Sequence, residues 1–199
     1  MRRASRATPP PDWVDTAANN SSTVTELFQG AYSIGGELAY ATNSSESNIH
    51  SHYVHPDALN LVDYTLKVDG WIEESKGGWG TTVLSDCTGG TFQDRYIRVR
   101  RYRREPSLRV VPHGTTCSGA TDTGFVPTPG EWFSLEIALS DAGGGDTQVD
   151  VRAWNRVDTR PASPQASCVT PLNAGTFGVW KMQGGDVAWD NLSATCAGP

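Results

Sequence analysis

Apolar and polar residues alternate along much of this chain with a period of two, and no segment has the spacing of an amphipathic helix. The alternation is clearest in LVDYTLKVDGWI (residues 61–72), WFSLEIALS (132–140) and TQVDVRAWN (147–155). Such segments are typical of half-buried strands. The residues predicted to face the interior are Val62, Tyr64, Leu66, Val68 and Ile72, then Phe133, Leu135, Ile137 and Leu139, and then Val149, Val151 and Ala153.

Glycine- and aspartate-rich segments separate these predicted strands, as in KGGWG, CTGG, SDAGGGD and QGGD. The segment SDAGGGD joins two of the strands and predicts a hairpin loop between them. Many strands with turn signals between them indicate an all-β sandwich or barrel. The 21 glycines and 12 prolines fit a chain with many turns.

The 199 residues are enough for one domain with its own core. Residues 1–24 are rich in proline and arginine and then in serine and asparagine, so we expect a flexible tail followed by one domain over residues 25–199. The basic start MRRASRATPPPDW has no apolar segment behind it, so it is not a complete export signal. No apolar run reaches membrane-spanning length, and we expect no membrane-spanning segment.

The net charge of −6 argues against nucleic acid as the main partner, yet six of the twelve residues in DRYIRVRRYRRE (94–105) are arginine. A helix would spread these arginines around its circumference without an apolar stripe, so we predict a strand with a basic outer face. SLRVV (107–111) would return antiparallel to it. Ile97 and Val99 would face inward, Arg98, Arg100 and Tyr102 outward, and Arg101, Arg103 and Arg104 would form the turn.

The sequence contains four cysteines, and their spacing resembles no zinc module. We predict two disulfides, for which three connectivities are possible, with four free buried thiols as the alternative. The favoured pairs are Cys87–Cys117, which would close the excursion that holds the arginine strand, and Cys168–Cys196, which would hold the C-terminus. Disulfides would indicate an oxidising compartment, and we expect a secreted or cell-surface protein.

Several segments together resemble the LamG-like, or concanavalin A-like, lectin/glucanase domains over residues 27–197. They are LFQGAYSIGGELAY, LVDYTLKVDGWIEESKGGWGTTV, GEWFSLEIALS with TQVDVRAWNRV, and AGTFGVWKMQGGDVAWDNLSA, in which AWDNL is the most telling. The resemblance implies an all-β, two-sheet antiparallel jelly-roll sandwich. It also implies that one sheet is concave and that glycans bind on that concave face.

The laminarinase relatives use a Glu-Xaa-Asp-Xaa-Xaa-Glu pattern on one strand, which this sequence lacks. We therefore expect a non-catalytic extracellular module that binds a glycan or a surface, with a preference for anionic glycans. One alternative is a polysaccharide-cleaving enzyme, either a lyase on uronate polymers or a glycoside hydrolase, and another is a structural or adhesive domain that binds a protein. The predicted ligand-binding residues are Arg98, Arg100, Tyr102, Glu136, Arg152 and Trp154.

The sequence contains two candidate ion sites, one made of histidines and one of aspartates. NIHSHYVHPD (48–57) holds His50, His52 and His55, which we interpret as a surface loop rather than a zinc site because no carboxylate or cysteine motif accompanies them. The resemblance to lectin-like sandwiches favours structural calcium over zinc. The alternative is that the acidic residues only stabilise the turn and bind no ion. The candidate calcium ligands are Asp141, Asp146 and Asp190.

Overall fold

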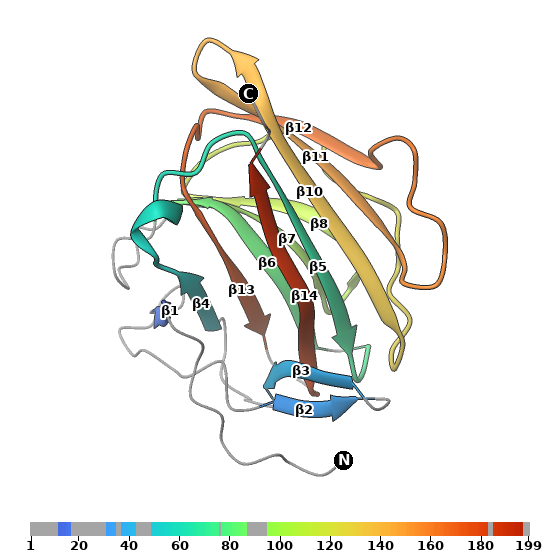
Figure 1. Ribbon diagram of the computed structural model, residues 1–199. Helices are drawn as coiled ribbons and strands as arrows, with labels where there is room; N and C mark the ends of the chain where they lie inside the picture. The colour runs from blue at the N-terminus through green and yellow to red at the C-terminus, as the bar shows by residue number, and fades with distance from the viewer. Residues whose placement is uncertain are drawn as a thin grey trace.

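Two antiparallel sheets packed face to face form the protein, as the computed structural model shows (Figure 1). The predicted all-β, two-sheet antiparallel sandwich is confirmed. The structure describes residues 12–16, 31–34, 37–42, 49–75, 77–86, 95–182 and 185–196.

The smaller sheet has six strands in the order β1-β4-β13-β6-β7-β8, and the larger has eight in the order β2-β3-β14-β5-β10-β11-β12-β9. A short 3-10 helix, η1 (Pro56–Ala58), follows β4. The strands of the six-stranded sheet are β1 (Trp13–Thr16), β4 (Ile49–Tyr53), β6 (Gly78–Ser85), β7 (Tyr96–Tyr102), β8 (Glu105–His113) and β13 (Thr176–Met182). Those of the eight-stranded sheet are β2 (Ala31–Ile34), β3 (Glu37–Thr42), β5 (Tyr64–Ile72), β9 (Ser118–Ala120), β10 (Trp132–Gly143), β11 (Asp146–Asn155), β12 (Ala166–Thr170) and β14 (Val187–Cys196).

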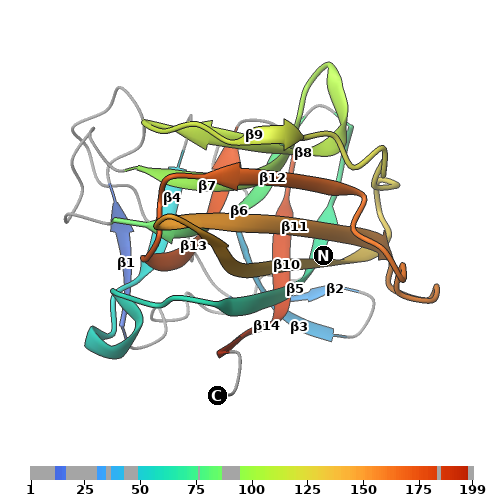
Figure 2. The same cartoon turned by 90° about the horizontal axis from the view of Figure 1, so that it is seen from above.

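Each sheet contains one run of three consecutive strands, β6-β7-β8 in one and β10-β11-β12 in the other, so local hairpins build part of both layers. Elsewhere the chain crosses repeatedly between the sheets, for example from β4 to β5, from β5 to β6 and from β13 to β14. Seen from above, the two layers enclose a single core (Figure 2). In the part of the chain that the structure describes, no helix has the length and apolar composition needed to cross a membrane.

Trp79 lies in the middle of the core and ties the two sheets together. Its indole N–H donates to the carbonyl of Ala188 at 2.9 Å, while Trp189 donates to the carbonyl of Gly80 at 3.0 Å. Gly70 leaves the space for the ring, because a Cβ there would lie 2.5 Å from Cζ2 of Trp79. These hydrogen bonds satisfy both buried indoles, which would otherwise cost stability.

The inward faces predicted from alternation are confirmed for the central strands of both sheets, with one exception. Val62 is 51% exposed because β5 begins only at Tyr64. The segment 1–24 was predicted to be a flexible tail, but Trp13–Thr16 forms β1 and pairs with β4, so the prediction is wrong for these four residues. Residues 1–11 and 17–24 lie outside the described residues.

The hairpin of β7 and β8 confirms the predicted antiparallel return of the arginine strand. Arg101 departs from the prediction, because it belongs to β7 and its side chain is buried rather than placed in the turn. A register shift between Arg100 and Tyr102 changes the alternation at this point. The Arg101 guanidinium donates to the carbonyl of Gly77 at 2.6 Å and to that of Ser75.

The favoured disulfide pairs are wrong, since the structure joins Cys117 to Cys168. The cause is the pairing of β9 with β12, which places Gly119 opposite Cys168 and so brings Cys117 to the same sheet edge, with the two Cα atoms 5.4 Å apart. Cys196 is an exposed free thiol at the end of β14. Cys87 lies outside the described residues.

Candidate functional site

The six residues predicted to bind a ligand fall on two different sheets. One half lies on β7 in the six-stranded sheet, and the other half lies on β10 and β11 in the eight-stranded sheet. Because the outer faces of a sandwich point in opposite directions, these two groups cannot form one site, and the expectation of a shared face is wrong. The first group is Arg98, Arg100 and Tyr102, and the second is Glu136, Arg152 and Trp154.

The outer face of the six-stranded sheet, called the arginine face below, is built on strand glycines. A Cβ at Gly78 would lie 3.0 Å from the Trp180 ring, and one at Gly80 would lie 3.1 Å from it. Because glycine has no Cβ, the Trp180 indole can lie flat on β6. A Cβ at Gly178 would lie 2.8 Å from the ring of His52, which crosses β13 at that point. Glycines in a strand commonly mark such a close approach.

Two arginines of β7 stack on the aromatic rings of this face. The guanidinium carbon of Arg98 lies 4.3 Å from the Trp180 ring centroid and 5.8 Å from that of Tyr96. Arg100 lies 5.6 Å from the Tyr102 ring and 6.0 Å from Trp180. Burial lowers the pKa of Arg98 to about 10, so this side chain is still a cation at neutral pH.

Arg100 has a carboxylate partner and still leaves donors unused. One of its terminal nitrogens lies 2.8 Å from Glu105. Its Nε and its Nη1 are buried and have no hydrogen-bond partner among the described residues, and the same holds for Nε2 of His50 and Oγ1 of Thr82. Register pairing places His50 on β4, Thr82 on β6 and Arg100 on β7 of this one face, with β13 and its Trp180 between His50 and the other two. A buried polar atom without a partner costs about 1–3 kcal/mol, so a group of them on one face is a mark of a ligand site.

The histidines complete the arginine face and correct the predicted surface loop. His50 and His52 lie on β4 and are only 2% and 0% exposed, while His55 follows the strand and caps η1. The His52 ring lies 3.0 Å from the hydroxyl of Ser85 through its Nε2. His50 and His52 share one face of β4, with their ring centroids 5.5 Å apart.

Tyr96 joins His50 to a further histidine that sequence analysis missed. Its ring meets that of His50 at 5.0 Å and that of His113 at 4.8 Å, both edge to face. Burial, followed by the charges of His52 and Arg98, holds the pKa of His50 well below its usual 6.5, so His50 is neutral at physiological pH. The arginine face therefore combines cations, flat aromatic rings and a neutral base.

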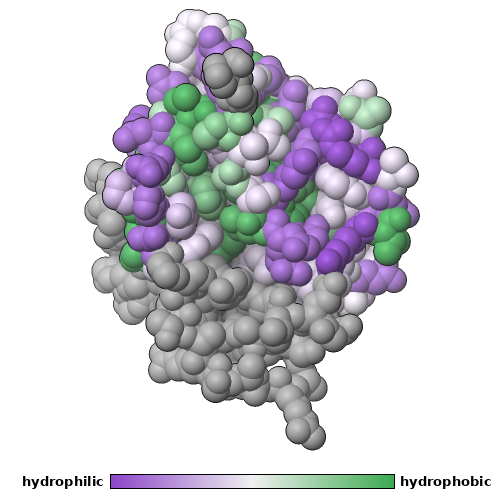
Figure 3. Space-filling view, viewed as in Figure 1, coloured by the Kyte–Doolittle hydropathy of each residue, from purple (hydrophilic) through white to green (hydrophobic). Residues whose placement is uncertain are grey.

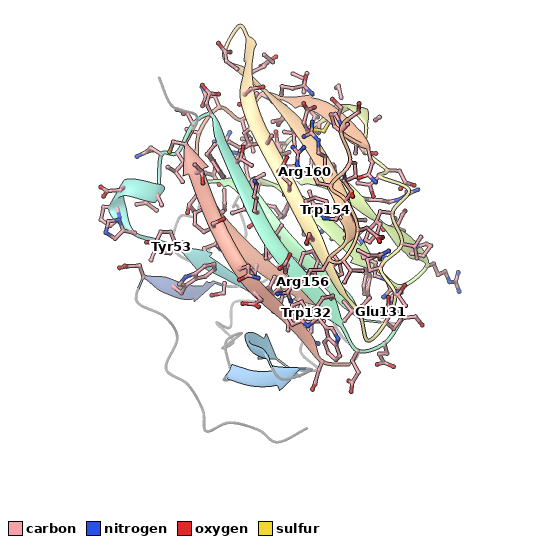
Figure 4. The ribbon with its side chains drawn as sticks, turned by 45° about the vertical axis from the view of Figure 1, so that its right-hand side comes forward. Tyr53, Glu131, Trp132, Trp154, Arg156 and Arg160 are labelled. Carbon is pink, nitrogen blue, oxygen red and sulfur yellow. A yellow bond between two sulfur atoms is a disulfide. The ribbon has the colours of Figure 1, made fainter. Side chains whose placement is uncertain are left out.

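The other half of the predicted site is an internal ion-pair cluster. Glu136 is 3% exposed and is shared by Lys67 at 3.5 Å, Arg152 at 3.4 Å and Arg160, which binds both carboxylate oxygens. Hydrogen bonding from Arg160 lowers the pKa of Glu136, with charge attraction adding to the effect. Three cations therefore share this one carboxylate, and Arg160 lies at the outer side of the sheet (Figure 4).

The three candidate calcium ligands are not gathered at one place. Asp141 and Asp146 lie at the β10–β11 hairpin. Asp190 on β14 is the register partner of Asp69 on β5, and Asp69 is the register partner of Ser134 on β10. Ser134 lies seven residues before Asp141 on that strand. Seven strand residues span about 23 Å. No group of three acidic, histidine or cysteine side chains suited to a metal is found within the described residues. Calcium binding itself stays a prediction.

A cavity of about 530 Å³ lies apart from the arginine face, at the open edge between β4, η1, β13 and β14. Its walls combine aromatic and aliphatic residues with polar ones such as Asp57 and Ser193, and apolar surface (green) runs through the upper left of the face seen in Figure 3. None of the arginines lines it, so it does not belong to the cationic site. Its aromatic lining residues are Trp13, Tyr53, His55 and Phe177.

No family model and no curated protein matches the sequence. Solved structures do match over nearly the whole chain. A marine PL-14 alginate lyase from Aplysia kurodai has a TM-score of 0.54 at 10% identity, covering 93% of this chain and 98% of the lyase. A legume lectin-like domain from Entamoeba histolytica has a TM-score of 0.54 at 10% identity, covering 94% of this chain and 91% of that one.

A galectin-like protein of unknown function from Bacillus subtilis has a TM-score of 0.51 at 9% identity, with 98% of this chain and 94% of that chain covered. The fold is a concanavalin A-like jelly roll. At such low identity the likeness shows the fold alone, because unrelated functions share one architecture. The function of this jelly roll has to be argued from its side chains.

Proposed function

We propose that the protein is an extracellular module that binds an anionic polysaccharide on the arginine face. The observation that carries the proposal is the group of buried polar atoms without partners, at Arg100, His50 and Thr82, beside the stacked indole of Trp180. Guanidinium groups form charge-assisted hydrogen bonds with carboxylate or sulfate. Because Trp180 is buried under Arg98, the half-buried Tyr102 is the ring on which a sugar would stack. The Cys117–Cys168 disulfide supports an extracellular site of action.

The accessible end of this face is the β7–β8 turn. Tyr102 is half-buried there between Arg100 and the exposed Arg103, whose guanidinium lies 4.9 Å from the Tyr102 ring. A polymer that approaches this end meets a ring and two cations first, and the buried residues lie deeper along the strands. Carboxylate or sulfate groups repeated along a chain suit this order of contacts.

Arg104 provides a matched control for the test, because it is exposed in the same turn and carries the same charge as Arg100. The assay is affinity electrophoresis of the purified chain in gels that contain sodium alginate or heparin. We expect Arg100→Gln to weaken retardation about tenfold or more, because it removes an oriented donor set, and Arg104→Gln to change it by less than about twofold. Equal effects of the two substitutions would reduce the binding to non-specific charge attraction and overturn the proposal.

A uronate-specific lyase is the second candidate, and the buried histidines favour it. A lyase needs a neutral base near a cation that stabilises the uronate carboxylate. His50 is neutral and lies on the same face as Arg98, and Tyr96 is in ring contact with His50. If the wild type releases unsaturated sugar ends from alginate and His50→Gln does not, the protein is a lyase and the binding-module proposal is wrong. Retention without such products supports the binding module.

A further inference from the structure

The outer face of the eight-stranded sheet carries three tryptophans that the proposed function does not use. Trp71 on β5 and Trp132 on β10 are register partners, and Trp154 on β11 pairs with Ser134, two residues from Trp132. From strand spacing, the Cα atoms of Trp132 and Trp154 lie about 8 Å apart. These three residues, called the tryptophan band below, cross three neighbouring strands, and Figure 4 shows Trp132 and Trp154.

The chain neighbours of these tryptophans show that the band faces away from the core. Gly70, next to Trp71, faces the rings of Phe133 and Trp79. Phe133, next to Trp132, and Ala153, next to Trp154, are both buried in the core. Because successive side chains of a strand point to opposite faces, the three indoles lie on the outer surface. Trp132 and Trp154 are each half-buried there, which leaves part of each ring accessible.

The charged groups beside the band are paired with one another. Arg156 lies 5.4 Å from the Trp132 ring and 3.2 Å from the carboxylate of Asp69. Asp69 also accepts hydrogen bonds from Ser134 at 2.6 Å and Asn191 at 2.9 Å. This network fixes the position of Arg156 and balances its charge. A ligand on the band therefore does not meet Arg156 as an unpaired charge.

Two indole N–H groups of the band have no acceptor. Nε1 of Trp71 and Nε1 of Trp132 are buried without a hydrogen-bond partner in the described part of the chain, and the whole Trp71 side chain is only 8% exposed. An indole N–H in this state normally finds a partner. The accessible parts of the Trp132 and Trp154 rings match the apolar face of a sugar ring, and a sugar hydroxyl would reach the Trp132 N–H only if the ring turned outward.

We propose that the tryptophan band is a second glycan site, which binds an uncharged polysaccharide lying across β10 and β11. It is independent of the arginine face, since the two sites lie on opposite sides of the sandwich. One protein would then bind an anionic and a neutral polymer at the same time, and cross-link them. This proposal does not rest on the proposed anionic site, and either can fail alone.

The test is affinity electrophoresis of the full chain in gels that contain laminarin, hydroxyethyl cellulose or dextran, with an alginate gel run beside them. The wild type should be retarded in at least one neutral gel, and the double variant W132A/W154A should lose about tenfold in affinity there. Its retardation by alginate should stay as in the wild type. Trp13→Ala is the matched control, because Trp13 is also half-buried but lies at the edge of the other sheet.

No retardation of the wild type in any neutral gel overturns the proposal, as does equal retardation of the wild type and W132A/W154A. If the double variant does not fold, judged by circular dichroism, the wild type decides by tryptophan fluorescence. A neutral polysaccharide that occupies the band should protect part of that fluorescence from acrylamide quenching, and W154F should reduce the protected fraction. Absence of protection overturns the proposal. Loss of alginate binding alone overturns only the anionic site.

Discussion

The Cys117–Cys168 disulfide should supply a large share of the stability of this fold. The bond closes a loop with a sequence separation of 51 residues that contains β10 and β11. The chain-entropy relation for a loop of this length gives about 4 kcal/mol at 25 °C, and residual structure in the unfolded chain lowers such values, so we expect about 2–4 kcal/mol. The double variant C117A/C168A should lose this amount in urea unfolding followed by tryptophan fluorescence.

Cys196 supplies the control for this prediction, because it is an exposed free thiol outside the loop. Cys196→Ala should change the free energy of unfolding by less than about 0.5 kcal/mol. A loss below about 1 kcal/mol in C117A/C168A would refute the loop-entropy argument. Peptide mapping that joins Cys117 to Cys87 instead would refute the β9–β12 register on which the argument depends.

Three further substitutions test the two faces. Gly178→Ala should lower the free energy of unfolding by about 1–3 kcal/mol, because the new Cβ would lie 2.8 Å from the His52 ring; an unchanged urea midpoint would contradict the tight packing there. Glu136→Gln should cost about 1–3 kcal/mol at neutral pH. Arg160 lowers the pKa of Glu136 from 4.5, so the wild type should be more stable than Glu136→Gln above pH 4.5 and should lose this extra stability as acid protonates the folded carboxyl. A difference in the free energy of unfolding that does not change with pH would contradict this. The folded state disfavours protonation of His50, so wild-type stability should fall as the pH drops below the ordinary histidine pKa of 6.5, and His50→Gln should flatten that slope in urea titrations.

Alternation along single strands was enough to predict the layered fold and most of its inward residues. The alternate residues of β10 from Phe133 to Leu139 (Phe133, Leu135, Ile137 and Leu139), together with Ile97 and Val99, are buried as predicted, because a period of two fixes the facing of each strand locally. Alternation does not say which sheet a strand joins. Arg98 and Trp154 were both correctly predicted to point outward, yet they belong to opposite outer faces. That separation depends on strand order, which single-strand patterns do not contain.

The histidines show a second limit, since NIHSHYVHPD has the composition of a loop but contains a strand. The signal that could have corrected this lay elsewhere in the sequence, in the glycines of GWG (78–80) and FGVW (177–180). A glycine inside a strand pattern indicates that another group approaches the backbone closely. Here Trp180 and His52 fill that space. The partner of each glycine is non-local, so the pattern predicts a contact without naming the residue that makes it.

The two outer faces differ in how their cations are stabilised, and this difference answers why an acidic chain concentrates arginines on β7. On the eight-stranded sheet, Glu136 and Asp69 bind the neighbouring cations directly. On β7, Arg98 and Arg100 lie over aromatic rings, an attraction that needs no carboxylate, and Arg100 also pairs with Glu105. The arginine face therefore presents guanidinium groups held by rings to an anion, whereas the tryptophan band offers apolar ring surface to an uncharged ligand. Ligand charge should decide which side of the sandwich is occupied.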